Sequence, residues 1–166
     1  MNLGCNYFLG KNKHYCKRPL YTYFFPFFSR PTMSYVVSFD TSCLYNLHTE
    51  DNLDINKLFG FSEGLHHKSS ARFGWNVIAG RIHLYNYCYV EGIRVYNFIC
   101  FVEPNVDYKL TIRRSATKYT FLVNTKGREI KRKDVERIQQ HKWGYKLWPY
   151  FGGNCKAPHD MLIQMK

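Results

Sequence analysis

The stretch that most constrains the fold is Gly80–Phe101, where aliphatic side chains alternate with Tyr, His and Arg at a period of two. Successive side chains of a β-strand point to opposite faces, so this period predicts two strands with one aliphatic and one aromatic face each. Glu91-Gly92 is suited to the two-residue turn of a β-hairpin. We expect the aliphatic face, with Phe101 on it, in the core. The tyrosine-rich face is then either a second buried layer or a ligand platform.

The remaining chain shows further segments of the same kind. Strands are expected at Ser34–Asp40, Ala71–Ile78, Lys118–Asn124, Tyr145–Phe151 and His159–Met165, and Pro104–Arg113 is expected to form a turn and then a strand. Asp134–His141 is expected to form helical turns, although it has little apolar stripe. With roughly eight strands, short polar turns and no strand–helix alternation, the sequence predicts an all-β fold. The expected architecture is an antiparallel two-sheet β-sandwich of jelly-roll type.

The segment Lys142–Met165 combines large aromatics with a double glycine and an Ala-Pro-His-Asp corner. Pro149 has no N–H to donate, which predicts an edge strand or a bulge there. Gly152 and Gly153 permit a sharp reversal. One interpretation is a tight corner between two core strands, since aromatics usually pack. The other is a loop that presents side chains to a ligand, namely Trp148, Tyr150, Asn154 and His159.

A length of 166 residues corresponds to one domain. The first 32 residues contain only basic charges and show no sustained period, whereas Met33 opens a regular strand. We therefore expect residues 1–32 to be a basic, aromatic extension, with the native start at Met33 and the β-sandwich domain over 33–166. Within the extension, Tyr21–Phe28 is interpreted as a short strand or a hydrophobic plug.

The formal net charge of +12 favours anionic partners such as nucleic acid, acidic glycans or phospholipid. Much of this charge lies in Lys126–Lys146, which is otherwise interpreted as a solvated face. No apolar run approaches about 18 residues, so no transmembrane helix is expected. No signal peptide is expected either, which makes the cytoplasm the default compartment. The six cysteines form no C-x-x-C pair, and reduced thiols are favoured.

Catalytic patterns are sparse. Most of the twelve acidic residues fall in turns, and no pair stands at a spacing that suggests glycoside hydrolysis. A lyase or nuclease could use His and Tyr as base and acid with Arg neutralising an anion. Residues of these types are His67, Arg72, His83, Tyr85 and Arg94. The alternative is that they are hydrogen-bonded residues on a half-buried sheet.

Metal sites and nucleotide sites have weak support. His66 and His67 are expected to point to opposite faces of a strand, so they would not chelate zinc together. Calcium held by strand-end carbonyls and Asp160 is the one cofactor that the sequence leaves open. The chain contains neither a Gly-rich phosphate loop nor a serine nucleophile elbow.

The first functional hypothesis is a non-catalytic, lectin-like domain whose aromatic face binds a glycan. Aromatic rings stack on pyranoses, and arginine favours an acidic sugar. The candidate ligand-binding residues are Arg72, Trp75, His83, Tyr85, Tyr87, Arg94, Tyr96, Trp148, Tyr150, Asn154 and His159. The second hypothesis is a phage or surface-appendage subunit that self-associates through this face. The third is nucleic-acid binding through Lys126–Lys146.

Four segments carry a resemblance to known proteins: His66–Trp75, Leu84–Gly92, Gly144–Gly153 and Ala157–Asp160. Together they resemble a group of small, mostly uncharacterised bacterial β-sandwich proteins. The resemblance covers about 33–166 and leaves out the first 32 residues. It implies a jelly-roll fold, but it implies no activity and no catalytic residue.

Overall fold

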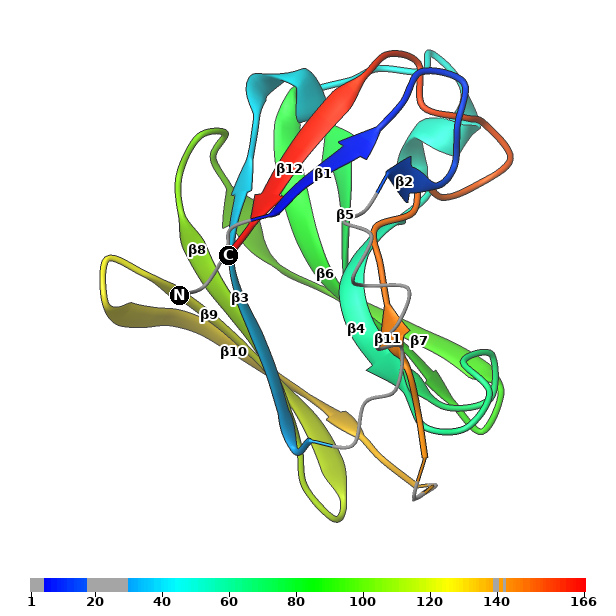
Figure 1. Ribbon diagram of the computed structural model, residues 1–166, viewed down its shortest axis with the longest axis vertical. Helices are drawn as coiled ribbons and strands as arrows, with labels where there is room; N and C mark the ends of the chain where they lie inside the picture. The colour runs from blue at the N-terminus through cyan, green and yellow to red at the C-terminus, as the bar shows by residue number, and fades with distance from the viewer. Residues whose placement is uncertain (1–4, 18–29, 139–140, 142) are drawn as a thin grey trace.

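The computed structural model describes residues 5–17, 30–138, 141 and 143–166, and it consists of two antiparallel sheets (Figure 1). In spatial order, the seven-stranded sheet comprises β10 (Arg128–Glu136), β9 (Lys118–Thr125), β8 (Tyr108–Arg114), β3 (Thr32–Phe39), β12 (Met161–Met165), β1 (Cys5–Leu9) and β2 (Cys16–Lys17). The five-stranded sheet comprises β11 (Lys146–Leu147), β4 (Asn56–Ser62), β5 (Ser70–Ile78), β6 (Arg81–Val90) and β7 (Ile93–Val102). Two short 3₁₀ helices, η1 (Thr41–Cys43) and η2 (Glu50–Leu53), precede β4. The all-β, two-sheet antiparallel sandwich is thus confirmed, while jelly-roll connectivity stays a prediction.

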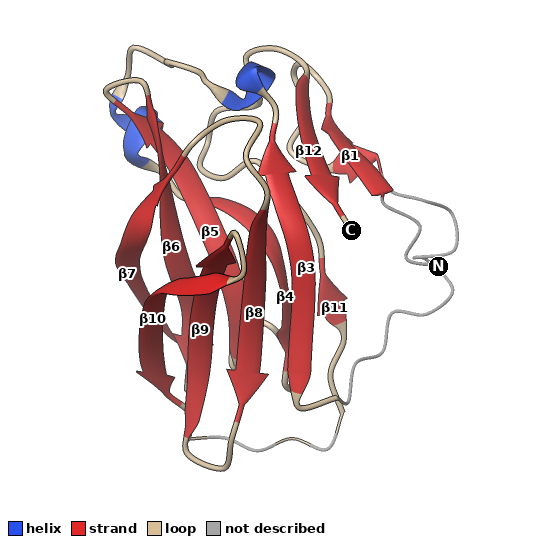
Figure 2. Cartoon of the chain, turned by 90° about the vertical axis from the view of Figure 1, so that its left-hand side faces the viewer, coloured by secondary structure: helices blue, strands red, loops and turns tan. Residues whose placement is uncertain are grey.

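The two sheets face each other (Figure 2). A cluster of buried apolar side chains fills the space between them. On β5, Phe73 and Trp75 point into it and are fully buried, because residues two apart lie on the same face of a strand. Phe73 meets Phe121 of β9 edge to face, with ring centroids 5.1 Å apart, which joins the two sheets. Burying one such side chain contributes about 1.5–3 kcal/mol. Because this interior is packed, a ligand site is expected on an outer face or at a sheet edge.

The β6–β7 hairpin turns at Glu91-Gly92 as expected, with φ values of 52° and 84°. Both are positive, as the common two-residue hairpin turn requires. The prediction for Phe101 was wrong. A bulge on β7 near Ile99 inserts one extra residue, so the alternation inverts and the Phe101 side chain is 39% exposed on the outer face.

The expected helical turns at Asp134–His141 are also contradicted, because β10 continues to Glu136 and pairs with β9. Val135 is buried by this pairing, which outweighs a weak helical preference. The other side chains of β10 are exposed and mostly charged. They make an edge that resists pairing with another sheet. The basic run Lys126–Lys146 therefore begins along this edge strand.

The N-terminal segment does not lie wholly outside the domain, which corrects the expected boundary at Met33. β1 pairs with β12 over five residues, and Tyr7 and Leu9 belong to the core. β1 buries these two side chains by pairing with β12. The sequence of the segment has no regular period, so it does not predict their burial. The predicted strand or plug at Tyr21–Phe28 falls outside the described residues. In the part of the chain that is described, no helix is long and apolar enough to cross a membrane.

A buried carboxylate closes one end of the sandwich. Glu63, directly after β4, is fully buried and accepts hydrogen bonds from Arg137 Nη2 at 2.6 Å, Arg114 Nη1 at 3.0 Å and Tyr119 Oη at 2.5 Å. All three donors come from the seven-stranded sheet or from the residue just after it. Burial alone would raise the pKa of Glu63, but these hydrogen bonds and positive charges outweigh it and leave the pKa lowered. Glu63 thereby links the two sheets electrostatically.

Candidate functional site

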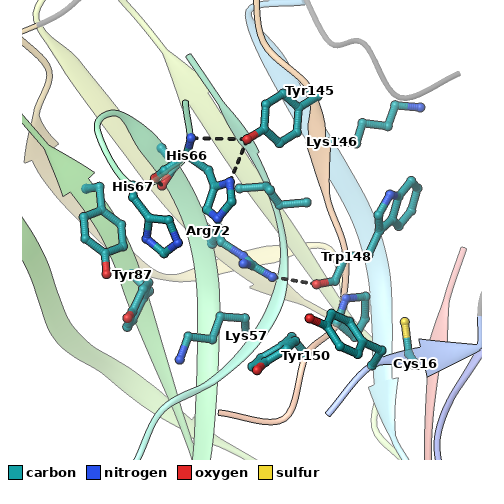
Figure 3. Close-up of a pocket in the computed structure, with 15 residues that line it drawn as sticks. Cys16, Lys57, His66, His67, Arg72, Tyr87, Tyr145, Lys146, Trp148 and Tyr150 are labelled. Atoms are coloured by element: carbon teal, nitrogen blue, oxygen red, sulfur yellow. Dashed lines mark hydrogen bonds between the residues drawn. The ribbon is translucent and has the colours of Figure 1, made fainter. Parts of the chain in front are cut away.

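A pocket of about 830 Å³ lies on the outer face of the five-stranded sheet (Figure 3). Its floor carries Lys57 of β4, Arg72 of β5 and Tyr87 of β6, whose side chains alternate with core-facing ones. The segment 145–150 forms one wall, and the turn 65–68 forms another. Tyr15 and Cys16, beside β2, complete the rim. The cavity is therefore built by three stretches that lie far apart in the chain, namely 15–16, 57–89 and 145–150.

Two glycines let the wall segment lie against β4. A Cβ atom at Gly144 would overlap the carbonyl oxygen of Ser62, and one at Gly152 would overlap that of Ile55. Between them, Ser62 N donates to Tyr145 O at 2.9 Å, and Tyr150 N donates to Lys57 O at 3.0 Å. The segment contains β11, which lies at the edge of its sheet, as Pro149 predicted.

Arg72 is the central cation of the pocket. Its side chain crosses the face of β4 at Gly60 and donates from Nη2 to the backbone oxygen of Trp148 at 2.5 Å. Its Nε atom is shielded from solvent and has no hydrogen-bond partner among the described residues. Burial lowers the pKa of Arg72 to about 10, partly offset by Tyr87 and Cys16, so the guanidinium remains charged at neutral pH. A charge removed from water without an anionic partner is costly, by several kcal/mol when burial is complete.

Lys57 adds a second cation to the same floor. Its Nζ donates to Ile55 O at 2.7 Å and lies 4.7 Å from the ring centroid of Tyr87. Burial, followed by repulsion from Arg72, lowers its pKa to about 8. No Asp or Glu side chain lines the pocket among the described residues. The pocket therefore has positive charge that nothing within its described lining neutralises, which favours an anionic ligand.

His66 and Tyr145 form a hydrogen-bonded pair at the rim, with His66 Nδ1 2.6 Å from Tyr145 Oη. The backbone N–H of His66 also donates to this Oη, at 3.3 Å. Burial, together with the charges of His67 and Arg72, lowers the pKa of His66 below its ordinary value. At neutral pH the imidazole is therefore mainly neutral and can accept a proton.

The two histidines correct a sequence-based expectation. They were expected on opposite faces of a strand, but His66 and His67 lie in a turn and their ring centroids are 4.1 Å apart. Ser70 Oγ donates to His66 O at 2.8 Å and helps to hold this turn. Both rings consequently reach the same pocket (Figure 3). Gly64, with a φ of 68°, and the serines at 69 and 70 are the local signals for such a turn.

Four of the predicted ligand-binding residues line the pocket: Arg72, Tyr87, Trp148 and Tyr150. The Trp148 ring stacks on Tyr7, with centroids 5.8 Å apart and planes at 17°, while its carbonyl accepts from Arg72. Sequence reasoning did not select the lining residues Lys57, His66, Tyr89, Tyr145 and Lys146. The residues next to Lys57 and Tyr145 in the sequence do not mark either of them as a pocket residue. Only the pairing of β4 with a distant segment brings the two into one pocket.

Four other predicted residues lie on the same outer face but beyond the pocket lining: His83, Tyr85, Arg94 and Tyr96. The His83 and Tyr85 rings are stacked 6.4 Å apart, and Tyr85 meets Phe98 at 6.0 Å. Tyr96 is 50% exposed. A hydrogen bond between Arg94 and Tyr87 raises the pKa of Arg94 and connects this open aromatic face with the pocket.

The remaining three predicted residues lie elsewhere. Trp75 is fully buried in the core, which takes it out of the expected aromatic face. His159 places Nε2 2.7 Å from the backbone oxygen of Ser42, next to η1. Asn154 is exposed in the loop before β12 and is not part of the pocket lining. Because Gly152 lies against Ile55, the chain beyond it turns away from the pocket.

The described residues contain no group of three or more His, Cys, Asp or Glu side chains placed to hold a metal ion. The side chain of Asp160, the carboxylate considered for calcium, accepts a hydrogen bond from the backbone N of Lys11 at 2.7 Å.

Comparison with protein-family models finds no match, and comparison with the sequences of curated proteins finds no match either. The resemblance to small bacterial β-sandwich proteins therefore stays a prediction.

Proposed function

We propose that this protein binds an acidic saccharide in the pocket on the outer face of its five-stranded sheet. The proposal depends on one observation about Arg72, whose guanidinium lies on the pocket floor. Among the described residues its Nε has no hydrogen-bond partner, and no carboxylate lies beside it in the pocket lining. A uronate or sulfate group would supply the missing anion, and hydrogen bonds from charged donors are the stronger ones.

The other lining residues suit a sugar ring. Tyr87 and Tyr150 bring aromatic rings into the cavity, and rings of this kind stack on the apolar faces of pyranoses. Lys57, His66 and Ser70 bring groups that hydrogen-bond hydroxyls. The volume lies in the range of small-ligand sites, roughly 300–1,000 Å³. Cationic and aromatic groups together favour an acidic sugar over a neutral one.

Calorimetric titration with uronate-containing, sulfated and neutral oligosaccharides tests this proposal. Arg72→Met should weaken binding of the acidic sugars at least about tenfold, because a hydrogen bond to a charged group contributes about 1.5–3 kcal/mol. Arg113→Met is the matched control, since it removes the same charge from an exposed position on β8 of the other sheet. Equal binding by both variants, or no binding of any acidic sugar, would contradict the proposal.

A second candidate function is self-assembly, which the exposed side chains of β7 favour. Tyr96, Phe98 and Ile93 are 50%, 44% and 68% exposed on this edge strand, and exposed apolar clusters often mark interfaces. Light scattering over a concentration series distinguishes the two candidates. A particle size that increases with concentration in the wild type but not in Phe98→Ser would support assembly. A monomeric size at every concentration would contradict assembly and would leave only the saccharide proposal.

A further inference from the structure

The pocket also contains the groups needed to cleave an acidic polysaccharide. We propose that it catalyses β-elimination on a uronate, with Tyr145 and His66 as the base, Arg72 binding the carboxylate and Lys57 as the acid. This inference rests on the proposed function, since it requires that an acidic saccharide bind there. It goes further by naming the sugar as a uronic acid and the reaction as bond cleavage.

The lining residues decide which cleavage chemistry is feasible. Hydrolysis of glycosidic bonds ordinarily uses two carboxyl groups that flank the bond. The described lining contains none, so that mechanism lacks its groups at this site. Elimination from a uronate requires a positively charged group instead of a pair of carboxyl groups. It needs a cation that stabilises the extra negative charge on the carboxylate as the neighbouring proton is removed, and Arg72 is such a cation.

The base is argued from the hydrogen bonds of Tyr145. Its oxygen accepts from the backbone N–H of His66 at 3.3 Å and lies 2.6 Å from Nδ1 of the same residue. When the imidazole proton is on Nε2, Nδ1 accepts the phenol hydrogen, and the proposed base requires this tautomer. A neutral imidazole can then take this hydrogen while Oη takes the proton of the sugar. His66 is suited to this role because its pKa is lowered.

The acid is argued from Lys57. Its ammonium group has three donors, of which one is engaged by Ile55 O at 2.7 Å. Lys57 lies on the floor beside Tyr87, whereas Tyr145 lies in the wall, so base and acid approach a bound sugar from different sides (Figure 3). A pKa of about 8 lies near neutral pH, where an acid donates a proton most effectively.

The proposed step balances without a further reactant. Tyr145 removes the proton from C5 of the uronate as its own proton passes to His66 Nδ1. The electron pair forms the C4–C5 double bond, the C4–O bond breaks, and the leaving oxygen takes a proton from Lys57. His66 has then gained one proton and Lys57 has lost one, and exchange with solvent restores both.

The test incubates the full chain with polygalacturonate, alginate and hyaluronate. Ultraviolet absorbance follows the conjugated double bond, and calorimetry measures binding of the same polymers. We expect an unsaturated product from at least one of them. Tyr145→Phe should lower the rate by about 100-fold or more, the usual contribution of a positioned acid or base, while changing affinity by less than about threefold. The control is Tyr35→Phe, which removes a phenol hydroxyl on β3 outside the pocket.

The outcomes separate the two proposals. Binding without unsaturated product from any polymer overturns the elimination and leaves the binding function standing. No binding of any uronate overturns both. Product formation that Tyr145→Phe leaves unchanged, or lowers only as much as Tyr35→Phe does, overturns the assignment of the base.

Discussion

Gly60 and Arg72 are paired across β4 and β5, and the Arg72 side chain lies over the position that a Gly60 side chain would occupy. A Cβ atom at Gly60 would lie 2.7 Å from Arg72 Cγ and would overlap the carbonyl oxygen of Ala71. The guanidinium reaches the Trp148 carbonyl only because this space is empty. The position of Arg72 in the pocket thus depends on Gly60 having no side chain.

Gly60→Ala should destabilise the protein by about 1–3 kcal/mol, since it inserts an atom into a closely packed position. It should also weaken acidic-sugar binding, because Arg72 must move. Urea denaturation measures the first effect and calorimetry the second. Gly10→Ala is the control, because a Cβ there meets its neighbours only at ordinary distances, 3.7 Å and beyond. A stable Gly60→Ala variant with unchanged affinity would contradict this account.

Arg72→Met should leave the melting temperature of the ligand-free protein unchanged or raised, although it weakens binding. The substitution removes a cation that is partly buried without an anionic partner, and replacing such charges by apolar groups is often neutral or stabilising. Differential scanning calorimetry of the free variant gives the result. A fall of several degrees would show that Arg72 serves structure rather than a ligand, through its hydrogen bond to Trp148.

Binding of an acidic sugar should weaken as the pH rises through about 8, where Lys57 loses its proton. Arg72 keeps its charge to about pH 10, so binding should decline without vanishing. Lys57→Arg should remove this pH dependence, because arginine stays protonated over the whole interval. Titrations at a series of pH values provide the check. A wild-type affinity that is constant between pH 7 and about 9 would rule out a charged Lys57 as a contributor.

The Glu63 cluster should make folding stability depend on acid pH. Its pKa is lowered in the folded state, so the unfolded chain binds the proton more tightly. The stabilisation is therefore fully present above the ordinary pKa of glutamate and is lost as the pH falls through the folded value. Chemical denaturation over a pH series should show this loss.

Glu63→Gln should remove that pH dependence and cost about 3 kcal/mol near neutrality, since Arg114 and Arg137 lose their carboxylate. Glu129→Gln is the control, because Glu129 is an exposed acid on the edge strand β10. If the two variants show the same stability profile, Glu63 does not link the sheets as described.

The sequence by itself determined the all-β class, the β6–β7 hairpin and its Glu91-Gly92 turn. These features follow from local periodicity and backbone conformation, which neighbouring residues dictate. The same reasoning selected Arg72, Tyr87 and Tyr150, because they alternate with core residues or accompany turn glycines. The prediction from periodicity was wrong at Phe101, because a single bulged residue inverts the alternation of side chains. No pattern in the neighbouring sequence predicts this bulge.

Only the tertiary structure decided where the site lies. Tyr145 meets His66 through β11 pairing with β4, and Lys57 meets Arg72 across neighbouring strands. β1 enters the sheet because β12 offers it an unpaired edge. Such contacts join residues far apart in the chain, and their stability comes from burial and strand pairing in the assembled sandwich. The cations and aromatic rings could be named from the sequence, but their convergence in one pocket without a described carboxylate arises only from the folded sheets.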